Sequence, residues 1–183
     1  MKKLITTIFA VVLMLFMTTE STFAQERGND SNRASPNASV SQTIGTTEVT
    51  VTYGRPGLKG RAYFGEETPL APIGSIWRTG ANESTAITFS DDVMFGGEHV
   101  EAGTYSLYTI PGSDEWTVIL NEKLSWGTQY DETEDYVRVT AEPAEGSDLE
   151  WFEIYFNELS DTKAHLNLHW GTVRVPVPIE TMN

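Results

Sequence analysis

Apolar and polar residues alternate with a period of two along most of this 183-residue chain. Val49, Val51 and Tyr53, for example, are separated from one another by single polar residues. Successive side chains of a β-strand point to opposite faces of the sheet, so the alternation predicts strands with one buried and one solvent-facing side. No segment after residue 24 has a convincing helical period.

Turn residues divide this pattern into about ten strands. Gly96 and Gly97 accept the positive φ angles of a tight turn and predict a hairpin between 93–95 and 98–100. A Pro-Gly-Ser-Asp turn predicts a second hairpin between 105–110 and 115–121. The other predicted strands lie at 48–53, 86–89, 136–141, 149–157, 165–170 and 172–177. We therefore predict an all-β fold, an antiparallel β-sandwich that is jelly-roll-like, with an up-and-down β-barrel as the alternative.

The N-terminal 24 residues have the pattern of a secretory signal peptide. Lys2 and Lys3 precede an apolar stretch at 4–17, and the small residues Thr22 and Ala24 fit a cleavage site. The stretch is shorter than the roughly 20 residues that span a bilayer, so we expect no membrane insertion after cleavage. The alternative is an uncleaved N-terminal anchor. We expect export to the periplasm or the extracellular space.

The rest of the chain divides into two parts. Residues 25–37 are polar and have no periodic pattern, which predicts a disordered lead-in. Residues 38–180 are predicted to form a single domain.

Charge and cysteine content exclude several classes of partner and site. The chain has 26 acidic and 12 basic side chains, a net charge of −14, and removal of the signal peptide would make it −15. Nucleic acid is therefore not an expected partner. The absence of cysteine excludes disulfides, thiol nucleophiles and thiolate metal sites. An acidic, lysine-poor surface is also predicted to favour high salt, which screens its self-repulsion.

One long segment, 54–83, interrupts the alternation. It contains six glycines and three prolines, but also tyrosine, phenylalanine, tryptophan, leucine and isoleucine. A connection of this length inside a compact domain is usually functional or disordered, and the apolar residues favour a long ordered loop over one end or face of the sandwich.

The same loop contains the candidate binding residues. Three of the seven arginines beyond residue 24 lie there, although the chain as a whole is strongly acidic. Arginine can clamp a carboxylate, phosphate or sulfate through two parallel hydrogen bonds. The sequence therefore predicts a site for a small polar or anionic molecule, including a carbohydrate or glycan. Its candidate residues are Arg55, Arg61, Trp77, Arg78, Asn82 and Glu83.

Each member of this set has an expected role, and other interpretations stay open. The arginines would be charge clamps, Asn82 would orient the ligand, and Trp77 would stack on it or form a wall. In the alternative, the arginines pair with Glu66, Glu67 and Glu83 and only hold the loop together.

Two further function classes also remain open. A cell-envelope hydrolase would use Glu83 as its acid or base, although the chain lacks a nucleophile-elbow serine motif. A structural or interaction module would use the loop for assembly. No cofactor is expected.

The histidines and one acidic run resemble metal-binding patterns only superficially. His165 and His169 share a face of one predicted strand with Asn167, and at this separation they stand roughly 13 Å apart. A solvated face is the favoured interpretation. Asp131–Asp135 lacks the glycine and distant glutamate of a calcium loop, so a solvated loop is favoured there. We expect no metal site.

Two aromatic residues near loops or on wetter strand faces, Trp126 and Trp151, are candidates for stacking on sugar rings. The alternative is that both faces of these strands are buried.

Six short segments carry a resemblance to a known family. They are Tyr53-Gly54-Arg55-Pro56, Lys59-Gly60-Arg61, Ile76-Trp77-Arg78-Thr79-Gly80-Ala81-Asn82-Glu83, Ala102-Gly103-Thr104-Tyr105-Ser106-Leu107, Ile110-Pro111-Gly112 and Glu115-Trp116-Thr117-Val118. The pattern resembles a bacterial family of exported proteins catalogued as domain of unknown function 2911, over about residues 36–178. The resemblance implies export and a single domain but no activity. It also implies that the six candidate site residues belong to the family's shared pattern.

Overall fold

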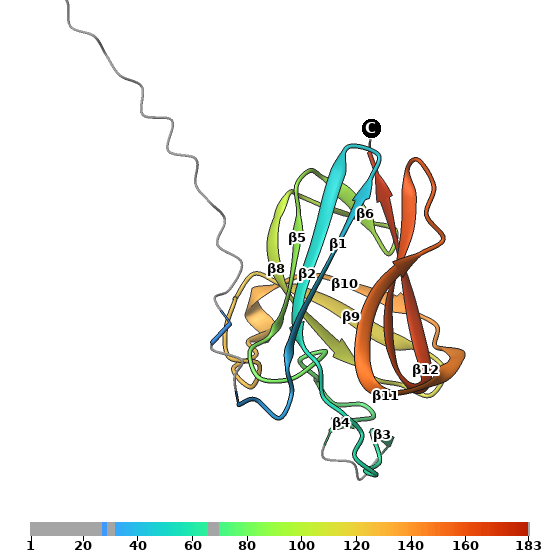
Figure 1. Ribbon diagram of the computed structural model, residues 1–183. Coiled ribbons are helices and arrows are strands. Elements are labelled where there is room, and N and C mark those ends of the chain that lie inside the picture. The colour runs from blue at the N-terminus through green and yellow to red at the C-terminus, as the bar shows by residue number, and fades with distance from the viewer. Residues whose placement is uncertain (1–26, 29–31, 66–69, 183) are drawn as a thin grey trace, which may run out of the picture.

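The computed structural model describes residues 27–28, 32–65 and 70–182, and it consists of two antiparallel β-sheets packed face to face (Figure 1). The larger sheet has the order β1-β2-β5-β8-β9-β10 and the smaller has the order β11-β12-β6-β7. The larger sheet contains β1 (Asn37–Ile44), β2 (Thr47–Gly54), β5 (Thr85–Phe89), β8 (Gly103–Ile110), β9 (Trp116–Asn121) and β10 (Asp135–Ala141). The smaller contains β6 (Val93–Phe95), β7 (Glu98–Val100), β11 (Ala144–Asn157) and β12 (Lys163–Thr181).

The predicted β-sandwich is confirmed. Both sheets keep free edge strands, β1 and β10 in one and β11 and β7 in the other, so they do not close into the alternative barrel. Strands of the larger sheet follow chain order. The β6–β7 hairpin and the two C-terminal strands cross to the smaller sheet. The fold resembles a jelly roll only in this crossing of strands between its two sheets.

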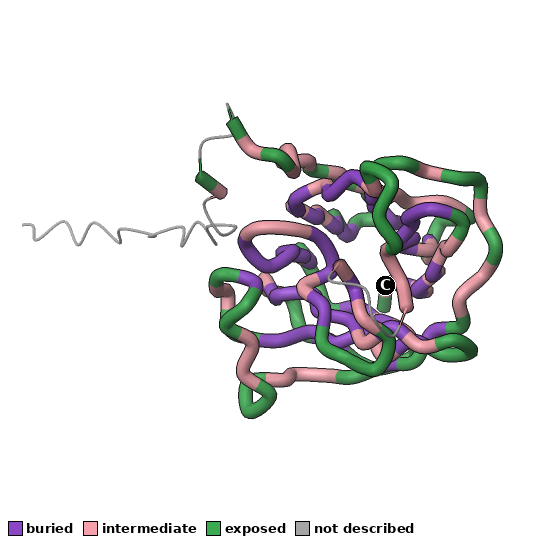
Figure 2. Tube along the Cα trace, turned by 90° about the horizontal axis from the view of Figure 1, so that it is seen from below, coloured by how far each residue is buried: buried purple, intermediate pink, exposed green. Residues whose placement is uncertain are grey.

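The alternation seen in the sequence produces the core between the sheets (Figure 2). On β2, Val49 and Val51 are fully buried and Tyr53 is nearly so, while Glu48 faces solvent. Full burial of side chains of this kind stabilises the fold by about 1.5–3 kcal/mol each.

Two features of the strands differ from the sequence prediction. Strand β1 was not among the predicted strands, and it begins at Asn37, the last residue of the expected lead-in. Strand β12 is a single element where two strands were predicted. Gly171 takes a φ of 53° in its middle, and the Tyr63 ring occupies the space that a Cβ there would fill.

The long segment is an ordered layer at the end of the sandwich away from the C terminus (Figure 1). It contains β3 (Phe64–Gly65) and β4 (Ala71–Pro72), which pair in parallel. Phe64 packs edge-on against Trp116, Trp77 and Trp170. These contacts place an aromatic cluster under the loop and confirm its predicted order for the part that is described.

The expected signal peptide, 1–24, lies outside the described residues. Within the described part of the chain, no helix has the length and apolar character needed to cross a membrane.

Candidate functional site

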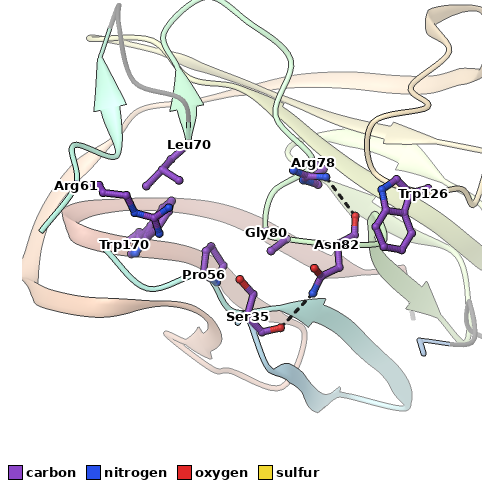
Figure 3. A pocket seen from close by; sticks show the side chains of 10 residues that line it. Ser35, Pro56, Arg61, Leu70, Arg78, Gly80, Asn82, Trp126 and Trp170 are labelled. Carbon is purple, nitrogen blue, oxygen red and sulfur yellow. Dashed lines mark hydrogen bonds between the residues drawn. The ribbon is translucent and has the colours of Figure 1, made fainter. Parts of the chain in front are cut away.

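Two of the candidate arginines, Arg61 and Arg78, line one hollow of about 330 Å³ beneath the long loop. Figure 3 shows Arg61 beside Pro56 and Trp170 on one side and Arg78 near Asn82 on the other. Within the described ranges, neither arginine forms an ion pair with a carboxylate.

The backbone around Arg78 fixes its position. Trp77 directly precedes Arg78. It exchanges two backbone hydrogen bonds with Thr109 of β8, at 2.7 and 2.8 Å, and these bonds anchor it on the sheet. Thr79 and Asn82 both have positive φ angles, which form the tight turn that follows. Gly127 lies against the Arg78 side chain, where a Cβ would collide with it. The stem of Arg78 is therefore held from both sides.

Arg78 is partly removed from water without a counter-charge. Its Nη1 donates one long hydrogen bond, 3.4 Å, to the backbone oxygen of Asn82. Burial lowers the pKa of the guanidinium below its ordinary value. Arginine remains charged in proteins. Arg78 therefore carries a positive charge whose hydrogen-bonding capacity is largely unused by the described residues.

Arg61 is exposed, and its hydrogen bonds to described residues all go to nearby backbone oxygens. Its Nε donates to the oxygen of Leu58 at 3.0 Å and its Nη2 to the oxygen of Gly57 at 2.8 Å. Arg61 lines the hollow, and the described residues leave the rest of its guanidinium available.

Asn82 and Trp126 complete the side of the hollow around Arg78 (Figure 3). The Asn82 amide nitrogen donates to the backbone oxygen of Ser35 at 3.1 Å. Trp126 is 47% exposed, a large fraction for a tryptophan. Trp126 was singled out in the sequence as a stacking ring, but nothing in its sequence position connected it to the arginines. A β-bridge between Glu83 and Trp126 makes that connection.

Glu83 is fully engaged by the N-terminal segment. Its two oxygens accept hydrogen bonds of 2.6 and 2.7 Å from Arg33, and its Oε1 also accepts from the Gly28 N–H at 3.2 Å. Arg27 approaches at 3.5 Å. The Arg33 hydrogen bonds are the main reason that the pKa of Glu83 falls to about 2. The expected lead-in residues thus make specific contacts, and Glu83 pairs with them rather than with the arginines of the loop.

The other two candidates, Arg55 and Trp77, do not line the hollow that contains Arg61 and Arg78. Arg55 donates from Nε to the backbone oxygen of Phe152 at 2.9 Å and lies 3.9 Å from Glu153, so it ties the loop to β11. Trp77 is only 4% exposed and stacks on Trp170 with ring centroids 5.9 Å apart. It is part of the core and does not line this hollow, but it does line the second hollow described below.

A second hollow of about 310 Å³ adjoins the first. Leu70 and Arg78 line both, and Ile76 and Thr128 belong to the second alone. Nearby, the buried hydroxyl of Tyr108 has no hydrogen-bond partner among the described residues. No sequence pattern singles out Tyr108, because it looks like an ordinary aromatic residue of a strand.

The histidines and the acidic run are used internally. His169 is buried rather than solvated, since a register shift in β11 brings Gly146 and Ser147 over it; its Nε2 lies 2.9 Å from the Ser147 oxygen. Asp131 caps a 3₁₀ turn, η1 (Glu132–Glu134), and Asp135 pairs with Arg138 at 2.7 Å. No group of three acidic or histidine side chains among the described residues is arranged to hold a metal ion.

The fold and this geometry define an antiparallel β-sandwich with an arginine-lined hollow under a long terminal loop. Residues 35–179 match the family model described as Protein of unknown function (DUF2911), and the chain belongs to that family. Comparisons with curated proteins and with solved structures found no match.

Proposed function

We propose that this protein is exported and binds a small anionic molecule in the hollow between Arg61 and Arg78. The two guanidinium groups act as charge clamps from opposite sides, and Asn82 orients the ligand by hydrogen bonding. The observation that carries the proposal is Arg78, a partly desolvated cation without a described carboxylate beside it.

The physical reason is the free-energy cost of removing the charge of Arg78 from water. A charge removed from water without a partner destabilises the folded state, and a bound anion would offset that cost with charge-assisted hydrogen bonds. Arg55 and Arg138 illustrate the contrast, since each lies beside an acidic side chain of the protein itself. The hollow is also at the lower end of the range of about 300–1,000 Å³ that is typical of small-molecule sites.

Glu83 is better assigned to structure than to acid–base chemistry. A carboxylate with a pKa of about 2 stays ionised at neutral pH, so it is a poor proton donor. Its oxygens are already occupied by Arg33 and Gly28. We therefore favour a binding protein over a hydrolase that depends on this residue.

Calorimetric titration with sodium sulfate tests the binding proposal. Wild-type protein should bind sulfate at one saturable site and unfold at a higher temperature in its presence. Arg78→Met keeps the apolar stem and should abolish both effects. Arg55→Gln removes the same charge from the same loop, outside the hollow, and should bind like wild type. Equal loss in both variants, or no saturable binding to wild type, would contradict the proposal.

The export proposal has its own test. The full chain should be recovered outside the cytoplasm with an intact mass that begins at Gln25. Recovery of the uncut chain in the cytoplasm or in membranes would overturn it.

A further inference from the structure

Arg78 lies at the junction of two hollows rather than inside one. The first contains Arg61, Asn82 and Trp126, and the second contains Ile76 and Thr128. Trp126 lines the first hollow, and the next two residues, Gly127 and Thr128, line the second. A ligand clamped by Arg78 can therefore extend to either side of it, which suits a chain of linked units better than a single small ion.

The chemistry of the two hollows is mixed in a way that matches sugars. Trp126 and Ile76, 47% and 38% exposed, offer apolar surface, while Asn82 and Thr128 offer polar groups. A sugar ring has apolar C–H faces that pack on an aromatic ring and hydroxyls that hydrogen-bond at its edge. A bare inorganic anion would use the arginines but would leave Trp126 and Ile76 without a role.

The charges indicate which sugars. The planar fork of arginine binds a carboxylate through two parallel hydrogen bonds, and two arginines line the first hollow. The net charge of −14 works against polymers of high negative charge density such as nucleic acid. A short chain of sugars with acid groups supplies such a carboxylate and carries only a few charges in total.

We infer that the ligand is an acidic oligosaccharide, a short chain of uronic-acid units, which spans both hollows with one carboxylate on Arg78 and one ring on Trp126. This inference rests on the proposed function, because it names the ligand class of the same site.

Calorimetric titrations with galacturonate, trigalacturonate and the uncharged maltotriose test it. Trigalacturonate should bind wild-type protein at least 10-fold more tightly than galacturonate, and maltotriose should show no binding. Trp126→Ala should weaken trigalacturonate binding at least 10-fold. The control is Leu159→Ala, which removes an apolar side chain that is 55% exposed and lies outside both hollows, and it should change nothing.

A blocking variant separates the two hollows. Thr128→Trp fills the second hollow and should reduce the affinity for trigalacturonate to that for galacturonate, while galacturonate binding stays at the wild-type level. Thermal unfolding verifies that each variant is folded, and if Thr128→Trp does not fold, Trp126→Ala decides alone.

The possible outcomes distinguish the oligosaccharide inference from the proposed anion site on which it rests. Sulfate binding that depends on Arg78, together with equal affinities for the monomer and the trimer, would overturn the oligosaccharide and leave the anion site standing. Wild-type affinity for trigalacturonate in Trp126→Ala would also overturn the oligosaccharide. Absence of both sulfate and uronate binding would overturn both.

Discussion

Arg78 is the residue at which stability and function are expected to conflict. Its guanidinium is partly buried and makes one hydrogen bond, of 3.4 Å, to the described part of the chain, and burial lowers its pKa. A side chain kept for structure would be paired, as Arg33 is with Glu83. The charge of Arg78 is better explained by a ligand than by the fold.

This predicts that Arg78→Met leaves the free energy of unfolding unchanged or raises it by up to about 1 kcal/mol, because the substitution removes a desolvated charge and keeps the stem. Denaturant unfolding in a buffer without sulfate or phosphate measures the effect. A loss of more than about 2 kcal/mol would show that Arg78 serves the fold.

The lowered pKa of Glu83 predicts that the free energy of unfolding depends on pH. Its folded pKa of about 2 lies below its ordinary value of 4.5. The stabilisation is therefore present above about pH 4.5 and is lost as the pH falls toward 2. At pH 7, Glu83→Gln should lower the free energy of unfolding by about 2–3 kcal/mol, and the difference from wild type should vanish near pH 2. Unfolding curves of both proteins from pH 7 to pH 2 measure this difference. A constant difference across this range would contradict the assignment.

At the scale of elements, the N-terminal segment behaves as part of the domain. Arg33 binds Glu83 with both guanidinium nitrogens, and the backbone of Ser35 accepts a hydrogen bond from Asn82. Ser35, within the predicted lead-in, thus lines the first hollow.

Arg33→Gln should therefore destabilise the protein by about 1.5–3 kcal/mol, because a nearly buried carboxylate loses its charged partner. A double-mutant cycle with Glu83→Gln measures the coupling. The double variant should be hardly less stable than either single variant. Additive losses would mean that the two side chains do not act as a pair.

Strand β12 depends on Gly171 where the chain bends against the Tyr63 ring. A methyl group at this position would combine an unfavourable positive φ with a collision. Gly171→Ala should cost about 2 kcal/mol or more, whereas Gly60→Ala, also at positive φ but in open space, should cost about 1 kcal/mol. Thermal and denaturant unfolding compare the two variants. Equal losses would show that the packing of Tyr63 is not what requires this glycine.

The strands were predictable to different degrees for physical reasons. Strand β2 has a clear apolar face, so its alternation was sufficient to define it. Strand β1 alternates mostly serine, threonine and glutamine around Val40, and its place at the edge of the sheet leaves it partly exposed. Its structure comes from pairing with β2, which local sequence does not encode.

The site was predictable as a segment but not as a geometry. Clustering of arginines in an acidic chain indicated the loop, and the loop contains Arg61 and Arg78. Which arginines face a hollow depends on contacts with distant strands. Arg55 is drawn to the backbone of Phe152, and Trp77 is stacked under the loop by Trp170.

At the scale of the whole molecule, a strongly acidic chain contains a hollow lined by two arginines. The net charge of −14 implies self-repulsion that salt screens. The melting temperature should therefore rise by about 3 °C or more from low to molar sodium chloride, equivalent to about 1 kcal/mol for a domain of this size. Scanning calorimetry across that range provides the measurement. A flat or falling melting temperature would contradict this interpretation of the charge.

The proposed binding function depends on Arg61 and Arg78 being available to a ligand. The most direct measurement follows the Nε–H signals of all arginine side chains by ¹H–¹⁵N nuclear magnetic resonance during a titration with sodium sulfate at constant ionic strength. We expect the Arg61 and Arg78 signals to shift along one saturable curve, while those of Arg55 and Arg138 stay in place. Shifts of similar size at all four residues, or no saturation, would contradict it.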